Sequence, residues 1–227
     1  MNLPFPGPVT ATENGLLLIS LVAAVVYLAM LQAPVSWRRT IAKTASTALL
    51  ALIAFHAGGP WLLVLALALS ALGDFFLAHD GSQPFLGGLA SFLLAHVAYV
   101  ALFVTHDPQA AHALPVTMLS LPMAIVATGL AALLAVFMAI RLMPVLPGEM
   151  KAPVGLYMAA IFAMAATAAF FQPVLAFAGA AAFMASDSVL AAGRFLMEAD
   201  DPRHRPASVF VWVSYYAAQV MILLALV

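Results

Sequence analysis

The chain has 227 residues, of which 66% are hydrophobic and only 7% are charged, and its net charge is −1. Soluble domains carry about 25% charged residues, so this composition predicts an integral membrane protein and excludes an ordinary soluble domain. The charge gives a nucleic-acid partner no electrostatic support, and the lack of cysteine excludes disulfides, thiolate nucleophiles and cysteine-ligated metals.

Residues 1–13 are rich in proline and contain no lysine or arginine. A secretory signal needs a basic start, so we expect this stretch to be a short non-cytoplasmic tail and the first apolar run to stay in the mature protein. A membrane-spanning helix needs about 20 mostly apolar residues. Eight runs qualify: residues 14–32, 40–56, 60–78, 85–104, 115–140, 151–171, 173–194 and 208–227.

Glycine and proline mark the joints between these runs, as at Gly58-Gly59-Pro60. The joint at Gln172-Pro173 divides about 40 apolar residues, which is twice the length that a bilayer requires. The sequence therefore predicts an all-α integral membrane protein, with one domain over residues 1–227 that is a bundle of eight transmembrane helices.

All the basic residues lie in or beside odd-numbered loops. They are Arg38, Arg39, Lys43, Arg141, Lys151, Arg194, Arg203 and Arg205. Because lysine and arginine concentrate in cytoplasmic loops, the odd loops are predicted to be cytoplasmic and both termini non-cytoplasmic. We expect a multi-pass protein of a bacterial inner (cell) membrane.

Two aspartates lie inside apolar runs, Asp74 near the end of 60–78 and Asp187 in 173–194. A charged group at mid-membrane costs about 2.5–3.5 kcal/mol on insertion scales, and such residues usually have a function. Two neighbouring carboxyls in an apolar site can present one proton-bearing acid and one ionised base at neutral pH. The alternative is that each aspartate fixes helix packing, through a cap or through Lys43 or Arg194.

At 1.5 Å per residue, the polar side chains fall in the cytoplasmic half and the middle of the membrane. The simplest arrangement is a cavity that opens toward the cytoplasmic leaflet. The second and sixth runs both begin near a lysine, and the third and seventh both contain a small residue followed by aspartate. This pattern suggests two parallel halves of four helices, in which the two aspartates are equivalent partners.

Residues Gly88, Phe92, His96 and Tyr99 share one face of the fourth run, because they are spaced by four, four and three. The glycine allows a second helix to approach closely. His96 is a candidate proton relay or substrate hydrogen-bond donor. Its alternative is a core histidine with a structural role.

The eighth run carries Trp212, Tyr215 or Tyr216, and Gln219 on one face. These side chains could orient a polar substrate atom or an aspartate, or could serve helix packing alone. Lys43 could hold an aspartate ionised, bind a lipid phosphate, or extend to the membrane surface. Arg194 could meet a phosphate or act only as a positive-inside residue. The candidate substrate-binding residues are Lys43, His96, Tyr99, Tyr215, Tyr216, Gln219 and Arg194.

Four motifs in order resemble the YhhN-like lysoplasmalogenase family. They are Gly73-Asp74, the Gly88/Phe92/His96/Tyr99 face, Ser186-Asp187, and Tyr215-Tyr216-x-x-Gln219, and the resemblance runs from about Arg39 to the C-terminus. It implies an eight-span hydrolase of lysoplasmalogens, which are lysolipids with a vinyl ether at sn-1. The implied products are a fatty aldehyde and glycerophosphoethanolamine or glycerophosphocholine. The family's proposed catalytic acids fall on Asp74 and Asp187.

The chemistry suits a carboxyl pair, because protonation of the outer alkene carbon gives an oxocarbenium ion that water captures, as in glycosidases. No metal or organic cofactor is required, and the sequence leaves open which aspartate is the acid. Two other classes compete. One is a proton-coupled transporter of small molecules or lipids that uses the same aspartates. The other is an intramembrane aspartyl protease, which Ala71-Leu72-Gly73-Asp74 disfavours because it lacks the first glycine of Gly-x-Gly-Asp.

Overall fold

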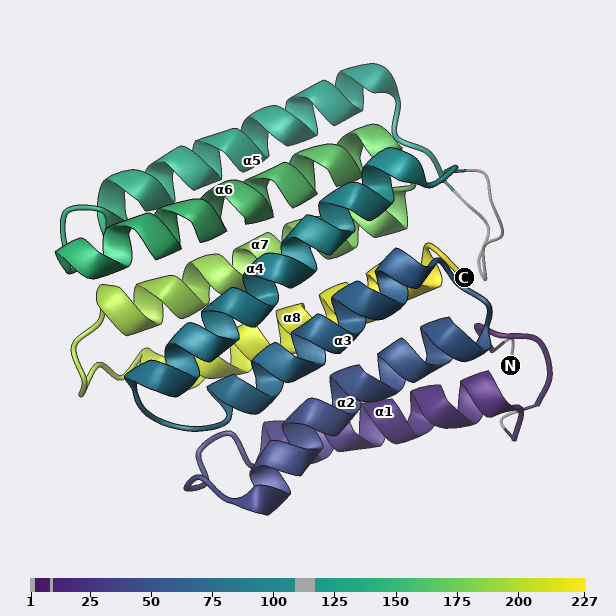
Figure 1. The fold of residues 1–227 in the computed structure, drawn as a ribbon, viewed down its shortest axis with the longest axis horizontal. Coiled ribbons are helices and arrows are strands. Elements are labelled where there is room, and N and C mark those ends of the chain that lie inside the picture. The colour runs from purple at the N-terminus through teal and green to yellow at the C-terminus, as the bar shows by residue number, and fades with distance from the viewer. Residues whose placement is uncertain (1–2, 9, 109–116) are drawn as a thin grey trace.

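The computed structural model describes residues 3–8, 10–108 and 117–227. Within those ranges the chain forms eight α-helices and no named strand (Figure 1). The helices are α1 (Thr12–Ala29), α2 (Trp37–His56), α3 (Trp61–Leu77), α4 (Ser82–Thr105), α5 (Leu121–Leu142), α6 (Gly148–Phe171), α7 (Val174–Phe195) and α8 (His204–Leu224). The prediction of an all-helical bundle is confirmed.

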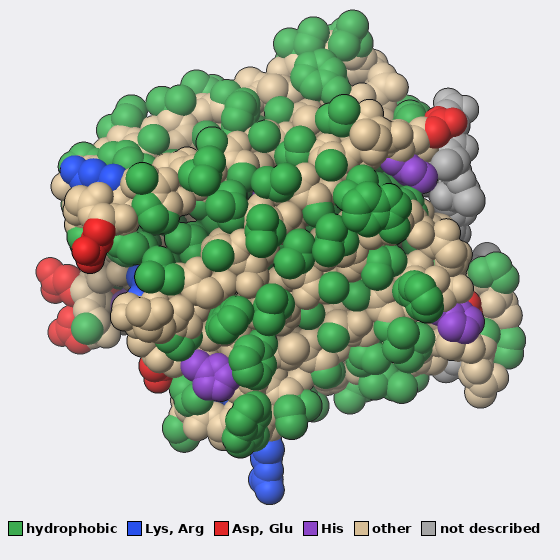
Figure 2. All heavy atoms as spheres, viewed as in Figure 1, with side chains coloured by type: hydrophobic (Ala, Val, Ile, Leu, Met, Phe, Trp, Pro, Cys, Tyr) green, Lys and Arg blue, Asp and Glu red, His purple; other side chains and the backbone are tan. Residues whose placement is uncertain are grey.

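Six of the described helices are long and apolar enough to cross a membrane: α1, α4, α5, α6, α7 and α8. Helix α3 is apolar but has only 17 residues, and the first two turns of α2 carry three basic residues. On the face shown in Figure 2, hydrophobic side chains cover the middle of the molecule, and charged side chains lie toward the helix ends. This distribution fits a multi-pass membrane protein.

The joint between α6 and α7 occupies two residues. Gln172 has a positive φ of 82°, which turns the chain, and α7 begins directly after Pro173. The segment before α5 pairs with this turn, since Leu119 N donates to Gln172 O at 2.7 Å and Val174 N donates to Thr117 O at 2.8 Å.

That pairing corrects the predicted start of the fifth span at residue 115. The helix begins at Leu121, because residues 117–120 are extended against the turn. Residues 115–116 lie outside the described residues.

The two ends of the bundle differ (Figure 1). Both termini lie at one end with the α2–α3, α4–α5 and α6–α7 connections, and the other four connections lie at the opposite end. We call the latter the odd-loop end. Helix α5 is at the edge of the bundle, where its only buried residues are Ala124, Met138 and Leu142.

Candidate active site

Asp74 is buried near the odd-loop end of α3, with 1% of its surface exposed. Its Oδ2 accepts hydrogen bonds from Thr47 Oγ1 at 2.8 Å and from the Tyr215 hydroxyl at 2.7 Å. The Lys43 ammonium lies 3.6 Å from its Oδ1. Three donors from α2 and α8 thus surround this carboxyl, as a buried charge requires.

The local sequence explains this cluster. Lys43 and Thr47 are one turn apart on α2, so both reach the same point on α3. Gly73 leaves room for the Phe92 ring of α4, because a Cβ at this position would lie 2.5 Å from that ring. Lys43 is itself buried, at 8% exposure, so it pairs with Asp74 instead of extending to the surface.

Asp187 lies on α7, and its side chain is 13% exposed. Its Oδ2 accepts a hydrogen bond from the Tyr157 hydroxyl of α6, and His96 Nε2 of α4 is 4.0 Å away. The fully buried His96 ring packs edge-on against Tyr157 and Phe183, at centroid distances of 5.1 and 4.8 Å. Its Nε2 has no hydrogen-bond partner among the described residues, because the 4.0 Å to Asp187 Oδ2 exceeds a hydrogen-bond distance.

Both aspartates border one cavity of about 580 Å³. Phe92 and Tyr215, whose ring centroids are 5.7 Å apart, also line it. The lining extends to His79 and His204, at the ends of the α3–α4 and α7–α8 connections. The cavity therefore reaches the odd-loop end, where the sequence predicts the polar opening.

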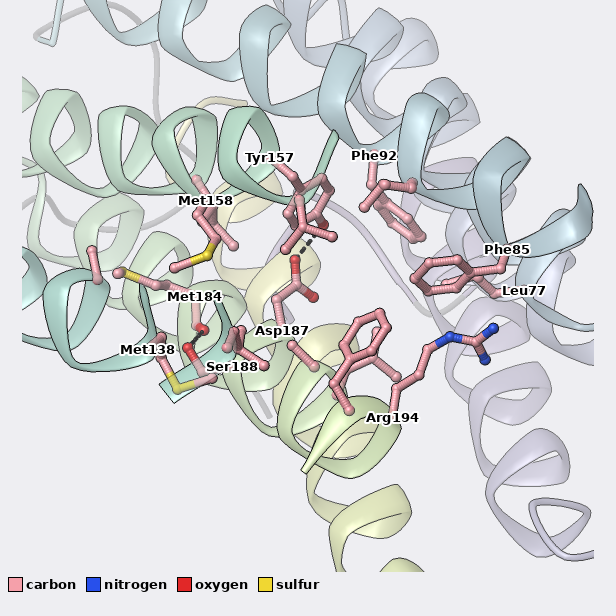
Figure 3. Close-up of a pocket in the computed structure, with 18 residues that line it drawn as sticks. Leu77, Phe85, Phe92, Met138, Tyr157, Met158, Met184, Asp187, Ser188 and Arg194 are labelled. Atoms are coloured by element: carbon pink, nitrogen blue, oxygen red, sulfur yellow. Dashed lines mark hydrogen bonds between the residues drawn. The ribbon is translucent and has the colours of Figure 1, made fainter. Parts of the chain in front are cut away.

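A second, smaller hollow of about 80 Å³ adjoins Asp187 on its apolar side (Figure 3). In this view the Asp187 carboxyl points toward Tyr157, with Phe92 and Phe85 across the hollow. Methionines from α5, α6 and α7 complete the wall: Met138, Met158 and Met184. Asp187 thus lies where a polar cavity meets an apolar one.

Basic side chains border the polar cavity, namely Arg39, Lys43, His79, Arg194 and His204. The Arg194 guanidinium lies 3.9 Å from the Phe85 ring centroid, which is a cation–π contact. Arg203 is instead paired with Asp201 at 2.6 Å, and this contact lowers the pKa of the Asp201 carboxyl to about 2. Arg194, in the last turn of α7, borders the cavity, whereas Arg203 and Arg205 do not.

Four of the candidate substrate-binding residues do not line the cavity, namely His96, Tyr99, Tyr216 and Gln219. The Tyr99 hydroxyl donates to Gln219 Oε1 at 2.5 Å, and both side chains are fully buried. The Tyr216 hydroxyl is 2.8 Å from Ser20 Oγ. These contacts support helix packing, and a substrate-binding role for these residues stays a prediction without geometric support.

Sequence reasoning missed Thr47 and Tyr157, which are the hydroxyl donors from α2 and α6. Isolated hydroxyl residues are common in membrane helices, so neither is conspicuous alone. The suggested repeat does not identify Tyr157 either, because Thr47 follows Lys43 by four residues whereas Tyr157 follows Lys151 by six.

Among the described residues, no group of three or more histidine, aspartate or glutamate side chains is positioned to hold a metal ion. The cavity offers the buried carboxyl groups of Asp74 and Asp187, the exposed carboxyl of Asp80, hydroxyl donors and basic side chains. This set can transfer protons and bind an anion.

Comparison with known proteins gives one family. A model described as the YhhN family matches residues 38–226. Two curated proteins named lysoplasmalogenase, from Mycobacterium bovis and Mycobacterium tuberculosis, are each 32% identical over 164 residues, which is 70% of this chain. The match spans 58% of the length of these relatives. No solved structure matches the chain.

Proposed function

The chain belongs to the YhhN family, as its motifs predicted, and on this premise we propose that it is a lysoplasmalogenase-type hydrolase embedded in the membrane. The proposed reaction cleaves the vinyl ether of a lysoplasmalogen to a fatty aldehyde and glycerophosphoethanolamine or glycerophosphocholine. The single observation that carries the proposal is that Asp74 and Asp187 border one cavity. The names of the two relatives support the substrate class.

The different contacts of the two carboxyls support different roles. Asp74 has the Lys43 ammonium and two hydroxyl donors, which suit an ionised carboxylate. Asp187 has one hydroxyl donor instead of two, and the rings of Phe85, Phe92 and Tyr157 line the same hollow, so its more apolar surroundings suit a carboxyl that carries a proton. We therefore assign Asp187 as the acid and Asp74 as the base.

The proposed cycle begins with a protonated Asp187 and an ionised Asp74. The Asp187 carboxyl gives its proton to the outer alkene carbon, which leaves an oxocarbenium ion beside two carboxylates. Water adds to this ion and gives a proton to Asp74, forming a hemiacetal. Asp74 then protonates the glycerol oxygen as the carbon–oxygen bond breaks, and the hemiacetal hydroxyl returns its proton to Asp187. Both acids end as they began.

The basic side chains explain how the headgroup binds in this proposal. Arg39, His79 and Arg194 border the polar cavity near the odd loops, where they can receive the lysolipid phosphate. Lys43 is engaged with Asp74, so its role is to neutralise that carboxylate. The phosphate then lies toward the odd-loop end and the alkyl chain toward the apolar side of Asp187.

We also propose the orientation and internal symmetry that the sequence suggested. The odd-loop end would face the cytoplasm and both termini the other side. Asp74 contacts α2 of its own half and α8 of the other, and Asp187 contacts α6 of its own half and α4 of the other. This exchange of partners is what two parallel four-helix halves would produce.

The test is aldehyde release by the purified protein in detergent or liposomes. The wild-type protein is expected to release aldehyde from a lysoplasmalogen, and Asp74→Asn and Asp187→Asn are each expected to lower the rate by about 10²–10⁴-fold. Asp200→Asn, in the exposed α7–α8 connection, is the matched control and should retain the wild-type rate. Proton-coupled uptake into liposomes without aldehyde would instead favour the transporter, which the named relatives do not favour.

A further inference from the structure

An apolar groove lies beyond Met184, on the side of the small hollow that faces the other end of the bundle. It has a volume of about 600 Å³ and lies between α5 and α7, with one wall residue from α6. Its lining has no charged side chain among the described residues, and it includes Met123, Leu130, Leu134, Ala165, Phe177 and Ala181. Its volume falls within the range of about 300–1,000 Å³ that is typical of ligand pockets.

The groove adjoins the candidate active site. Met184 lines both the groove and the small hollow that contains Asp187 and Tyr157. Asp187 in turn lines both that hollow and the polar cavity with its basic side chains. Along α7, Asp187, Met184, Ala181 and Phe177 are spaced by three, three and four residues, so they follow one helix face.

This order of surfaces matches an amphiphile with one chain. Basic side chains and the exposed Asp80 border one end, Asp74 and Asp187 lie in the middle, and only apolar side chains line the groove. From Asp187 to Phe177 the helix rises about 15 Å, which is about half the hydrocarbon thickness of a bilayer and so the depth that one lipid chain occupies.

We propose that the groove between α5 and α7 binds the alkyl chain of the lysolipid, so that its first carbons, which carry the vinyl ether, lie beside Asp187. The identity of the reacting bond rests on the proposed function, but the binding of the chain does not. The groove selects a single-chain lipid by its chain, while the polar cavity binds its phosphate. The α5 residues Met123, Val126 and Leu130 line the groove and are more than half exposed, so the groove opens along α5 and a chain could enter it from the bilayer.

The test combines chain-length kinetics with photo-cross-linking. Ala181→Phe puts a ring into the groove, and Ala159→Phe puts the same ring on an exposed position of α6 outside the groove lining. Ala181→Phe is expected to lower kcat/KM for a long-chain lysoplasmalogen by about tenfold relative to a short-chain one. Ala159→Phe should leave this ratio unchanged, and thermal melting of both variants checks their folding.

The cross-linking arm requires no turnover. A lysophosphatidylcholine with a diazirine at the end of its chain is expected to label α5 and α7 near Met123 and Phe177 in the wild type and in Ala159→Phe, but not in Ala181→Phe. Cross-links in the groove without aldehyde release would contradict the proposed function and leave this inference standing.

Three results would overturn the inference. The first is labelling on other helices, and the second is an unchanged chain-length ratio in a folded Ala181→Phe protein. The third is equally effective competition by diacyl phosphatidylcholine, which would show that the groove holds ordinary bilayer lipid.

Discussion

At the scale of residues, the site consists of two carboxyls with unlike neighbours. Asp74 faces a lysine and two hydroxyls, whereas Asp187 faces one tyrosine hydroxyl and a buried histidine ring. The aspartates could be predicted from the sequence, because an isolated charge in an apolar run is conspicuous. Thr47 and Tyr157 could not, because their importance depends on which helices become neighbours.

The hydroxyl of Tyr157 is expected to matter for turnover. Tyr157→Phe keeps the ring beside His96 and removes the hydrogen bond to Asp187, so kcat should fall by about 10- to 100-fold, as for other bonds to ionisable groups. Tyr99→Phe is the matched control, because the Tyr99 hydroxyl binds Gln219 outside the cavity. It should lower stability by about 1 kcal/mol and leave kcat unchanged. Equal losses of kcat in the two variants would contradict the role of Tyr157.

The pair of Lys43 with Asp74 gives a prediction on stability. Lys43→Met leaves a buried carboxylate without its partner, so the free energy of unfolding should fall by about 3 kcal/mol and turnover should be lost. The double variant Lys43→Met/Asp74→Asn should regain stability but not activity. Denaturation in detergent, followed by circular dichroism, measures the stability of both variants, and aldehyde release measures their activity. A single variant as stable as the wild type would show that Lys43 is not needed to neutralise Asp74.

At the scale of elements, helix positions follow from apolar runs and from the breakers between them. The two-residue joint at Gln172-Pro173 could be predicted because the combined apolar run is about twice the length that one membrane-spanning helix needs. The start of α5 could not, because the segment before it is held by backbone hydrogen bonds to that same joint. Local helix propensity does not depend on contacts between segments that are distant in the sequence, so it could not predict this start.

Two glycines make a matched pair for testing how the helices pack. At Gly179 of α7, an added Cβ would lie 2.9 Å from the carbonyl oxygen of Ala218 in α8, so Gly179→Ala should cost about 1–3 kcal/mol of stability. At Gly129 of α5 the space is open, so Gly129→Ala should be neutral or stabilise by about 0.5–1 kcal/mol. Thermal melting of both variants gives the comparison. A Gly179→Ala protein as stable as Gly129→Ala would contradict the close approach of α7 and α8.

At the scale of the whole molecule, the number of helices determines at which end of the bundle the two termini lie. An even number of helices places both termini at one end, and the basic residues mark the other (Figure 1). The depth of the polar residues also predicted where the cavity would open. The sequence could not supply the apolar groove, because neither α5 nor α7 shows from its own residues that a space remains between them.

The proposed orientation can be measured with single cysteines, since the chain has none. Thr10→Cys in the N-terminal tail should react with a membrane-impermeant maleimide in intact cells. Asp200→Cys in the α7–α8 connection should react only after permeabilisation. Both positions are exposed, so accessibility within the protein does not limit either reaction. The reverse pattern would place the cavity on the opposite side of the membrane.

The central claim is that Asp74 and Asp187 act together on one bond. Catalytic groups that act as a unit have strongly non-additive effects on rate, whereas independent groups have losses that multiply. The most direct measurement is the rate of aldehyde release by Asp74→Asn, Asp187→Asn and the double variant. The account predicts that the double variant is no slower than the slower single variant, within about threefold. A double variant whose loss is the product of the two single losses would contradict it.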